Sequence, residues 1–325
     1  MAAQSEYNLA LDCVQVTEAA AIAAGRWLGH GDNHRADQAA VEAMRTTLDR
    51  LGVDATVVIG EGERDEAPML YIGERIGTPG TTEVDIAVDP LEGTNLVARG
   101  QPGSTAVIAV AEKGGLLHAP DTYLDKLVVG PQAAGKVDLN FPVRANLRII
   151  ADSLHRKIED LTVVVLERER HKELIAEIRE AGARIKMIAD GDLGAAISVA
   201  VSGTGDHAVM GIGGAPEGVL AAAALRCLGG EILARFRPRN DGEGERAVTM
   251  GIDLERTYNT RDLASGEHVI FTATGVTSGD LLKGVQYFAG GARTHSLVMS
   301  AATGTFRFID TVHMFDRTLV PGVRL

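Results

Sequence analysis

The segment at residues 84–95, VDIAVDPLEGTN, contains several groups that could bind a metal ion. Alternating apolar residues and aspartates predict a short strand, which Pro90 ends and which opens into a turn at Gly93. Three carboxylates and one hydroxyl therefore crowd onto a strand end and the loop after it: Asp85, Asp89, Glu92 and Thr94. Carboxylates at close range repel one another, so the cluster needs a compensating cation.

The ligand type indicates which cation would fit. Oxygen-only ligands favour a hard ion such as Mg2+ or Mn2+. A strand end closed by an Asx-type turn is the alternative, since Asp-Pro and Gly-Thr-Asn both suit such a turn. We favour the metal site because ordinary turns rarely stack so many acids. Asp85 lies furthest back in the strand, and we interpret it as a structural residue.

Further acids follow other predicted elements in the N-terminal half. Asp37 begins a predicted helix at residues 37–51, and Glu61 follows a short apolar strand at residues 56–59. The carboxyl ends of strands in an open α/β sheet converge on one crevice, so these acids could share a site with Asp89. Asp37 could instead be a helix N-cap, and the acidic loop at residues 60–66 could simply be solvated.

The string GIGGAPEG at residues 211–218 predicts a strand-to-helix turn in the C-terminal half. Pro216 fits the first turn of the helix, whose free N–H groups favour an anionic group. Glu217 could complement the helix dipole or supply a metal ligand from across the crevice. A dinucleotide site is disfavoured, since Pro216 replaces the third glycine of that fingerprint.

Two more charged groups follow predicted strands, at residues 168–171 (RERH) and residues 190–192 (DGD). Arginine suits bidentate contacts to phosphate, although exposed charge is an equal alternative for the first group. The second group could be an ordinary turn, or it could place carboxylates against the hydroxyls of a sugar.

Strands and helices must bring these groups together. A helix is predicted at residues 9–28, and a strand at residues 105–111. After about residue 146, strands and helices alternate, which favours a partly parallel sheet covered by helices. Strands are predicted there at residues 161–166, 184–189, 207–212, 269–273, 297–301 and 306–311, helices at residues 171–181, 193–201 and 216–228, and a flexible loop at residues 237–245.

Composition excludes several classes of function. The 325 residues carry a net charge of −12 without a basic run, which argues against nucleic-acid binding. No apolar run reaches the roughly 18 residues that span a bilayer, and the N-terminus lacks the pattern of an export signal. Cys13 and Cys227 are far apart in apolar surroundings and are predicted to be buried, reduced thiols. We therefore expect a cytoplasmic protein.

Taken together, these residues resemble the class II fructose-1,6-bisphosphatases of the lithium-sensitive, metal-dependent sugar phosphatase superfamily. The likeness runs from about residue 9 to residue 316. The string DPLEGT at residues 89–94 indicates only the superfamily. VIGEGERDEAPMLYIGE at residues 58–74, together with GGAPEG at residues 213–218, is specific to class II.

The resemblance implies a layered α-β-α-β-α sandwich, with an α+β metal-binding half at residues 1–145 and an α/β substrate-binding half at residues 146–325. It also implies two ions of Mg2+ or Mn2+, one held by Asp37 and Glu61 and the other by Asp89, Glu92 and Glu217. Catalysis would involve Thr94, Glu61 and Asp65. Substrate contacts would come from Glu92, Gly93, Thr94, Tyr123, Arg168, Glu169, Arg170, Asp190, Gly191, Asp192 and Gly214. The chain departs from the family pattern at Asn33, where family members carry Lys; Arg35 or His34 could substitute.

The expected reaction is hydrolysis of the 1-phosphate of fructose 1,6-bisphosphate, and sedoheptulose 1,7-bisphosphate is a second expected substrate. Thr94, hydrogen-bonded to Glu61 or Asp65, could orient the attacking water. The family forms homo-oligomers, so a homodimer or homotetramer is expected. An inositol-monophosphatase-like or nucleotide phosphatase is the nearer alternative, and a non-catalytic sugar-phosphate sensor is the more distant one.

Overall fold

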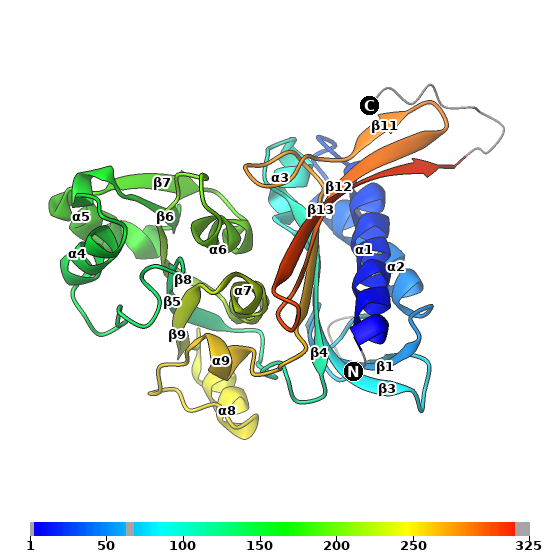
Figure 1. Cartoon of the computed structure of the whole chain (residues 1–325), viewed down its shortest axis with the longest axis horizontal. Coiled ribbons are helices and arrows are strands. Elements are labelled where there is room, and N and C mark those ends of the chain that lie inside the picture. Colours follow the sequence, from blue (N-terminus) through cyan, green and yellow to red (C-terminus); the bar gives the residue numbers. More distant parts are fainter. Residues whose placement is uncertain (1–2, 63–67, 316–325) are drawn as a thin grey trace.

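The computed structural model describes residues 3–62 and 68–315, which form two sheets and three groups of helices (Figure 1). The helices of these residues are α1 (Ala3–Gly25), α2 (Asn33–Leu48), α3 (Thr94–Arg99), α4 (Val143–Ser153), α5 (Lys172–Ala181), α6 (Asp192–Ala200), α7 (Ala215–Leu228), α8 (Asp241–Thr249) and α9 (Thr260–Leu263). Short 3₁₀ turns lie at Ile158–Asp160 and Glu169–His171. Among these helices, none combines the length and the apolar character that crossing a membrane requires.

The larger sheet has eight strands. Its members are β1 (Val53–Ile59), β2 (Arg75–Gly77), β3 (Thr82–Glu92), β4 (Thr105–Glu112), β10 (Ile270–Gly275), β11 (Gln286–Phe288), β12 (Gly291–Ser300) and β13 (Thr305–Met314). They follow the order β11-β12-β10-β4-β3-β1-β2, and β13 also pairs with β12. The β1–β3 pair is parallel, whereas β3 and β4 are antiparallel. This sheet holds the strand predicted to carry the acidic cluster.

The smaller sheet has five strands in the order β7-β6-β8-β5-β9. They are β5 (Tyr123–Val129), β6 (Thr162–Leu166), β7 (Arg184–Ile188), β8 (Ala208–Gly214) and β9 (Glu231–Arg237). β6 is parallel to β7 and β8, as the strand–helix alternation predicts. The sheets do not follow the expected division at residue 145. β5 already belongs to the smaller sheet, and β10 to β13 return to the larger one.

Helices separate and cover the sheets, which confirms the predicted layered sandwich. α1 and α2 cover one face of the larger sheet, α6 and α7 lie between the two sheets, and α4 and α5 cover the far face of the smaller sheet (Figure 1). α7 contacts both sheets, and its alanines at residues 221–224 are all buried. Small side chains allow both sheets to pack closely on this helix, which carries Glu217 at its first turn.

Three elements begin or end elsewhere than the residue pattern predicted. α2 begins at Asn33 and is capped by Asp32, which accepts from the Arg35 N–H, so Asp37 is not the cap. β3 continues through Pro90, where its register against β4 shifts. The loop expected at residues 237–245 contains the start of α8, where the Asn240 side chain accepts from the Glu243 N–H.

Candidate active site

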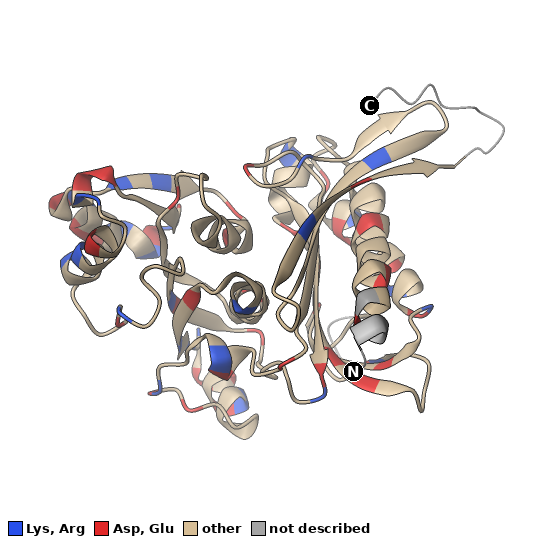
Figure 2. Ribbon diagram, viewed as in Figure 1, with Lys and Arg blue, Asp and Glu red and all other residues tan. Residues whose placement is uncertain are grey.

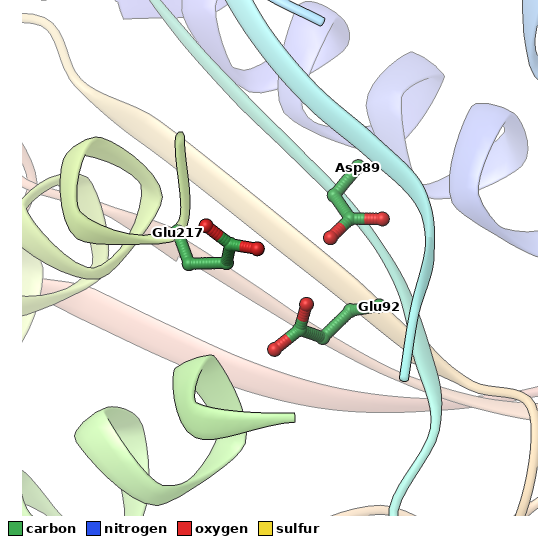
Figure 3. A group of neighbouring side chains, drawn as sticks. All are labelled: Asp89, Glu92 and Glu217. Atoms are coloured by element: carbon green, nitrogen blue, oxygen red, sulfur yellow. The ribbon is translucent and has the colours of Figure 1, made fainter. Parts of the chain in front are cut away.

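Three carboxylates from distant parts of the chain meet between the two sheets. Asp89 and Glu92 extend from β3, and Glu217 extends toward them from α7 (Figure 3). One oxygen from each carboxylate lies within 4.8 Å of the others. The prediction that these residues share a site is therefore supported by geometry as well as by residue type.

An irregularity in β3 brings Asp89 and Glu92 to the same side. Residues three apart in a regular strand point to opposite faces, but the register shift between these two changes the alternation. Pro90 has no N–H to lose at this point. The Leu91 N–H donates to Asp89 Oδ1 at 3.0 Å, and the Leu193 N–H donates to Glu92 Oε1 at 3.2 Å. These bonds fix one oxygen of each carboxylate.

Glu217 contributes an oxygen without a protein partner. Its Oε2 atom is buried and has no hydrogen bond within the described residues. The carboxylate also packs on the backbone before it, since a Cβ built on Gly214 would lie 1.9 Å from Oε2. A buried anionic oxygen is costly when it is unpartnered, so a cation fits here. The all-oxygen donor set matches a hard divalent ion.

Burial and mutual repulsion raise the pKa values of the whole acidic group. Burial, together with the charges of Asp37 and Asp89, raises the pKa of Glu61 to about 8. Burial is also the main reason why the pKa of Glu92 lies well above its ordinary value, with contributions from Asp89 and Glu217. The pKa values of Asp37, Asp89 and Glu217 are raised by burial as well. Asp89 thus acts on both predicted ligand groups.

Two predicted catalytic groups have different outcomes. The Thr94 hydroxyl, at the first position of α3, donates to the Leu91 carbonyl oxygen at 3.0 Å and so uses its proton on the backbone rather than on Glu61. Gly93 precedes it with a φ of +77°, a left-handed conformation that favours glycine. Asp65 lies outside the described residues.

A chain of hydrogen bonds joins Asn33, Asn95 and Asp190. Asn33 donates to Asn95 Oδ1 at 3.4 Å, and Asn95 donates to Asp190 Oδ2 at 3.2 Å. Asp190 also lies 3.9 Å from an Arg168 guanidinium nitrogen. Asn95 was missed as a site residue because an asparagine soon after a turn glycine is typical of an ordinary turn. The structure thus connects the position that departs from the family pattern to the predicted sugar-binding loop.

Tyr123 has two guanidinium groups near its ring. The Cζ atom of Arg170 lies 4.7 Å from the ring centroid, and that of Arg239 lies 5.2 Å from it. Arg170 also donates to the Ile212 carbonyl oxygen at 2.8 Å. Arg239 was missed because the sequence placed it in a loop, although its ion pair with Glu243, 2.6 Å, fixes it at the start of α8. Two cations beside one aromatic ring can bind an anionic group.

The remaining predicted substrate residues divide into two groups. Gly214 pairs with Tyr123 across β8 and β5, and Asp192 opens α6 after Gly191. Glu169 instead forms a surface ion pair with Lys172, and its side chain is 81% exposed. Lys126, which sequence reasoning missed inside a strand, lies 2.8 Å from Asp192 and is buried with it.

Comparison with known proteins places this geometry in context. The family described as "Bacterial fructose-1,6-bisphosphatase, glpX-encoded" matches residues 7–313. A protein of Synechococcus sp. (strain JA-2-3B'a(2-13)), named D-fructose 1,6-bisphosphatase class 2/sedoheptulose 1,7-bisphosphatase, is 52% identical, with 98% of this chain and 99% of that protein covered. A protein of the same name from Synechocystis sp. (strain ATCC 27184 / PCC 6803 / Kazusa) is 51% identical over 94% of this chain and 96% of its own.

Proposed function

This chain belongs to the bacterial fructose-1,6-bisphosphatase family, and we propose that it hydrolyses the 1-phosphate of fructose 1,6-bisphosphate to fructose 6-phosphate and phosphate. Its class of enzyme is therefore phosphoric monoester hydrolase. The observation that carries the proposal is the buried group of Asp89, Glu92 and Glu217, in which Glu217 Oε2 lacks a protein partner. Metal-dependent phosphate transfer requires such an oxygen-rich site.

Two divalent ions, Mg2+ or Mn2+, are proposed as cofactors. Asp89, Glu92 and Glu217 would hold one ion, and Asp37 and Glu61 would hold the other. The charge of Asp89 raises the pKa values of both Glu61 and Glu92, which supports two neighbouring metal positions. When bound, the ions neutralise the phosphoryl oxygens, lower the pKa of water and stabilise the leaving alkoxide.

The proposed role of Thr94 is to orient the attacking water. Its proton is used by the Leu91 carbonyl, so its oxygen is left to accept a hydrogen bond from the water. Glu61 would accept the proton that the water loses, with Asp65 as an assisting group.

The sugar bisphosphate would lie between the metal ligands and the smaller sheet. Glu92, Gly93 and Thr94 would contact the reacting end, and Asp190, Gly191, Asp192 and Gly214 the sugar. Tyr123, Arg168, Glu169 and Arg170 complete the proposed set. The guanidinium groups of Arg170 and Arg239 beside the Tyr123 ring support a second phosphate subsite, so we add Arg239 to these residues. Sedoheptulose 1,7-bisphosphate is proposed as a further substrate, because the names of the Synechococcus and Synechocystis relatives include sedoheptulose 1,7-bisphosphatase.

Phosphate release from both bisphosphates tests this function. We expect turnover with Mg2+ or Mn2+ and loss of turnover after treatment with a chelator, with recovery when metal is returned. Activity that persists after complete removal of metal would contradict the mechanism. A clear preference for inositol monophosphate or nucleotides would reject the substrate assignment.

We also propose that the protein is a cytoplasmic homodimer or homotetramer. Cys13 and Cys227 are both unpaired thiols, which suits a reducing compartment. An outer edge of β13, with exposed Phe306 and Phe308, supports contact with a second copy.

A further inference from the structure

Lys126 is a buried lysine that contacts two residues of the proposed substrate site. It lies on β5, its side chain is 4% exposed, and its Nζ atom lies 2.8 Å from Oδ2 of Asp192, whose side chain is 7% exposed. The same ammonium group donates to the Gly214 carbonyl oxygen at 3.3 Å. Lys126 therefore joins β5, the start of α6 and the end of β8.

The ion pair packs directly against the backbone that leads to Glu217. A Cβ built on Gly213 would lie 2.2 Å from Asp192 Oδ2 and 2.8 Å from Lys126 Nζ. Any side chain at this position would therefore displace the pair. The absence of a side chain at Gly213 allows Lys126 and Asp192 to meet beside the metal-binding carboxylates.

Stability alone does not account for this arrangement. A buried ion pair is often no more stabilising than apolar residues of the same size, because both charges lose their hydration. Asp192 also adds a negative charge near a crowded group, since it raises the pKa of Glu217 while Lys126 lowers it. What the pair does provide is a carboxylate that is fixed in place at the start of α6.

We propose that Lys126 is a positioning residue that holds Asp192 and the Gly214 carbonyl in the orientation that binds the sugar hydroxyls of the substrate. The inference rests on the proposed function, which makes Asp192 and Gly214 substrate residues. Lys126 acts through these two residues. Its loss should therefore weaken sugar binding more than it slows the chemical step.

The variant Lys126→Met tests this role with fructose 1,6-bisphosphate and Mn2+. We expect KM to rise by about tenfold or more while kcat changes by less than about threefold. Calorimetric binding of fructose 6-phosphate should weaken to a similar degree, whereas binding of inorganic phosphate and the Mn2+ dependence should not change. Lys186→Met is the matched control, because Lys186 lies on β7 of the same sheet and its ion-pair partners, Asp206 and Asp280, are not proposed substrate residues.

A double variant keeps the test decisive if Lys126→Met does not fold. Lys126→Met/Asp192→Asn removes both members of the buried pair, and its KM should lie within about threefold of that of Asp192→Asn alone, because only the contact with the Gly214 carbonyl is then lost in addition. A KM of the double variant that lies well above this range would overturn the proposal. So would a folded Lys126→Met with the KM and fructose 6-phosphate affinity of the unmodified protein, while hydrolysis itself would remain established. Absence of turnover in the unmodified protein would reject the function and this role together.

Discussion

Burial of individual carboxylates in the acidic group costs free energy, and a bound cation would offset that cost. Glu217 is the clearest case, since its Oε2 atom is buried without a partner in the described residues. Asp89 and Glu92 each have one oxygen fixed by a backbone N–H. Asp89 and Glu92 are thus held in place before any ion binds, which reduces the entropy lost on binding.

Replacing Glu217 with Gln should separate metal binding from folding. The amide keeps the size of the side chain and removes one charge from a repelling group, so the metal-free variant should be at least as stable as the unmodified protein. Its kcat/KM should fall by at least about 100-fold, because a metal ligand matters at least as much as the residues around it. Thermal denaturation with and without Mn2+ provides the check. The exposed Glu177→Gln is the control, and a Glu217→Gln variant with normal activity would contradict the assignment.

Glu61 should make the stability of the metal-free protein depend on pH. Its pKa is raised from 4.5 to about 8 by burial, so the folded protein holds this proton more tightly than the unfolded chain does. The contribution is complete below the ordinary pKa of 4.5 and is lost as the pH rises from there to about 8. The free energy of unfolding of Glu61→Gln should therefore exceed that of the unmodified protein by an amount that grows over this window.

Denaturant titration in the presence of a chelator measures that difference. The difference in the free energy of unfolding between Glu61→Gln and the unmodified protein removes most of the contribution of Asp89, Glu92 and Glu217. The pKa values of these three residues are also raised by burial. Saturating Mn2+ should reverse the order of the two stabilities, because the proposed ligand Glu61 gives the unmodified protein the tighter metal site. A difference that stays constant between about pH 5 and about pH 8 would show that Glu61 titrates normally.

At the scale of elements, the turn from β8 into α7 sets the direction of Glu217. Gly214 has a φ of −67°, which any residue can adopt, so its backbone does not require glycine. The requirement comes from space, because a Cβ there would lie 1.9 Å from Glu217 Oε2. The carboxylate of Glu217 is the far end of a flexible side chain and can move away from a new Cβ at residue 214. The substitution should therefore disturb the metal site more than it disturbs the fold.

Gly214→Ala should therefore fold but bind metal poorly. We expect a Tm within a few degrees of the unmodified protein and a rise of about tenfold in the Mn2+ concentration that gives half-maximal activity. Gly194→Ala is a matched control in α6, where a new Cβ meets nothing within 4 Å and should stabilise the helix by roughly 0.5–1 kcal/mol. Equal metal dependence in the two variants would contradict the role of the turn.

These elements also mark the limit of what the sequence predicts. Pro216 in a first helical turn, and the strand–helix alternation around it, are local patterns and were predicted correctly. The passage of β3 through Pro90 depends on the register of β4, which no pattern within β3 contains. Lys126 was missed for the same reason, because its partner Asp192 lies on another element far along the chain.

At the scale of the whole molecule, the site depends on a chain path that passes from the larger sheet to the smaller one after β4 and returns to the larger sheet at β10. β3 belongs to the larger sheet, whereas Glu217 lies on α7 between the sheets. Residue types alone indicated a metal site, but the partnership of Glu217 with Asp89 came from family resemblance and is now supported by proximity. Lys and Arg are spread over both halves in Figure 2, with no single element collecting them.

The edge of the larger sheet gives the last prediction, which concerns assembly. β13 pairs with β12 on one side, and within the described residues no strand pairs with its other side. Phe306 is 60% exposed and Phe308 47% exposed along this strand. Exposed aromatic residues on an unpaired edge favour association, so a second copy of the chain is the proposed partner.

Replacing both residues, in Phe306→Ser/Phe308→Ser, should shift the protein toward a smaller species in light scattering without a large loss of stability, because the removed side chains are largely exposed. Phe141→Ser is the control, since Phe141 is 46% exposed but lies in the loop before α4, far along the chain from β13. Metal-dependent activity should survive in both variants, because Asp89, Glu92 and Glu217 come from a single chain. An unmodified protein that is monomeric at micromolar concentration, or a double variant whose mass is unchanged, would show that this edge does not mediate assembly.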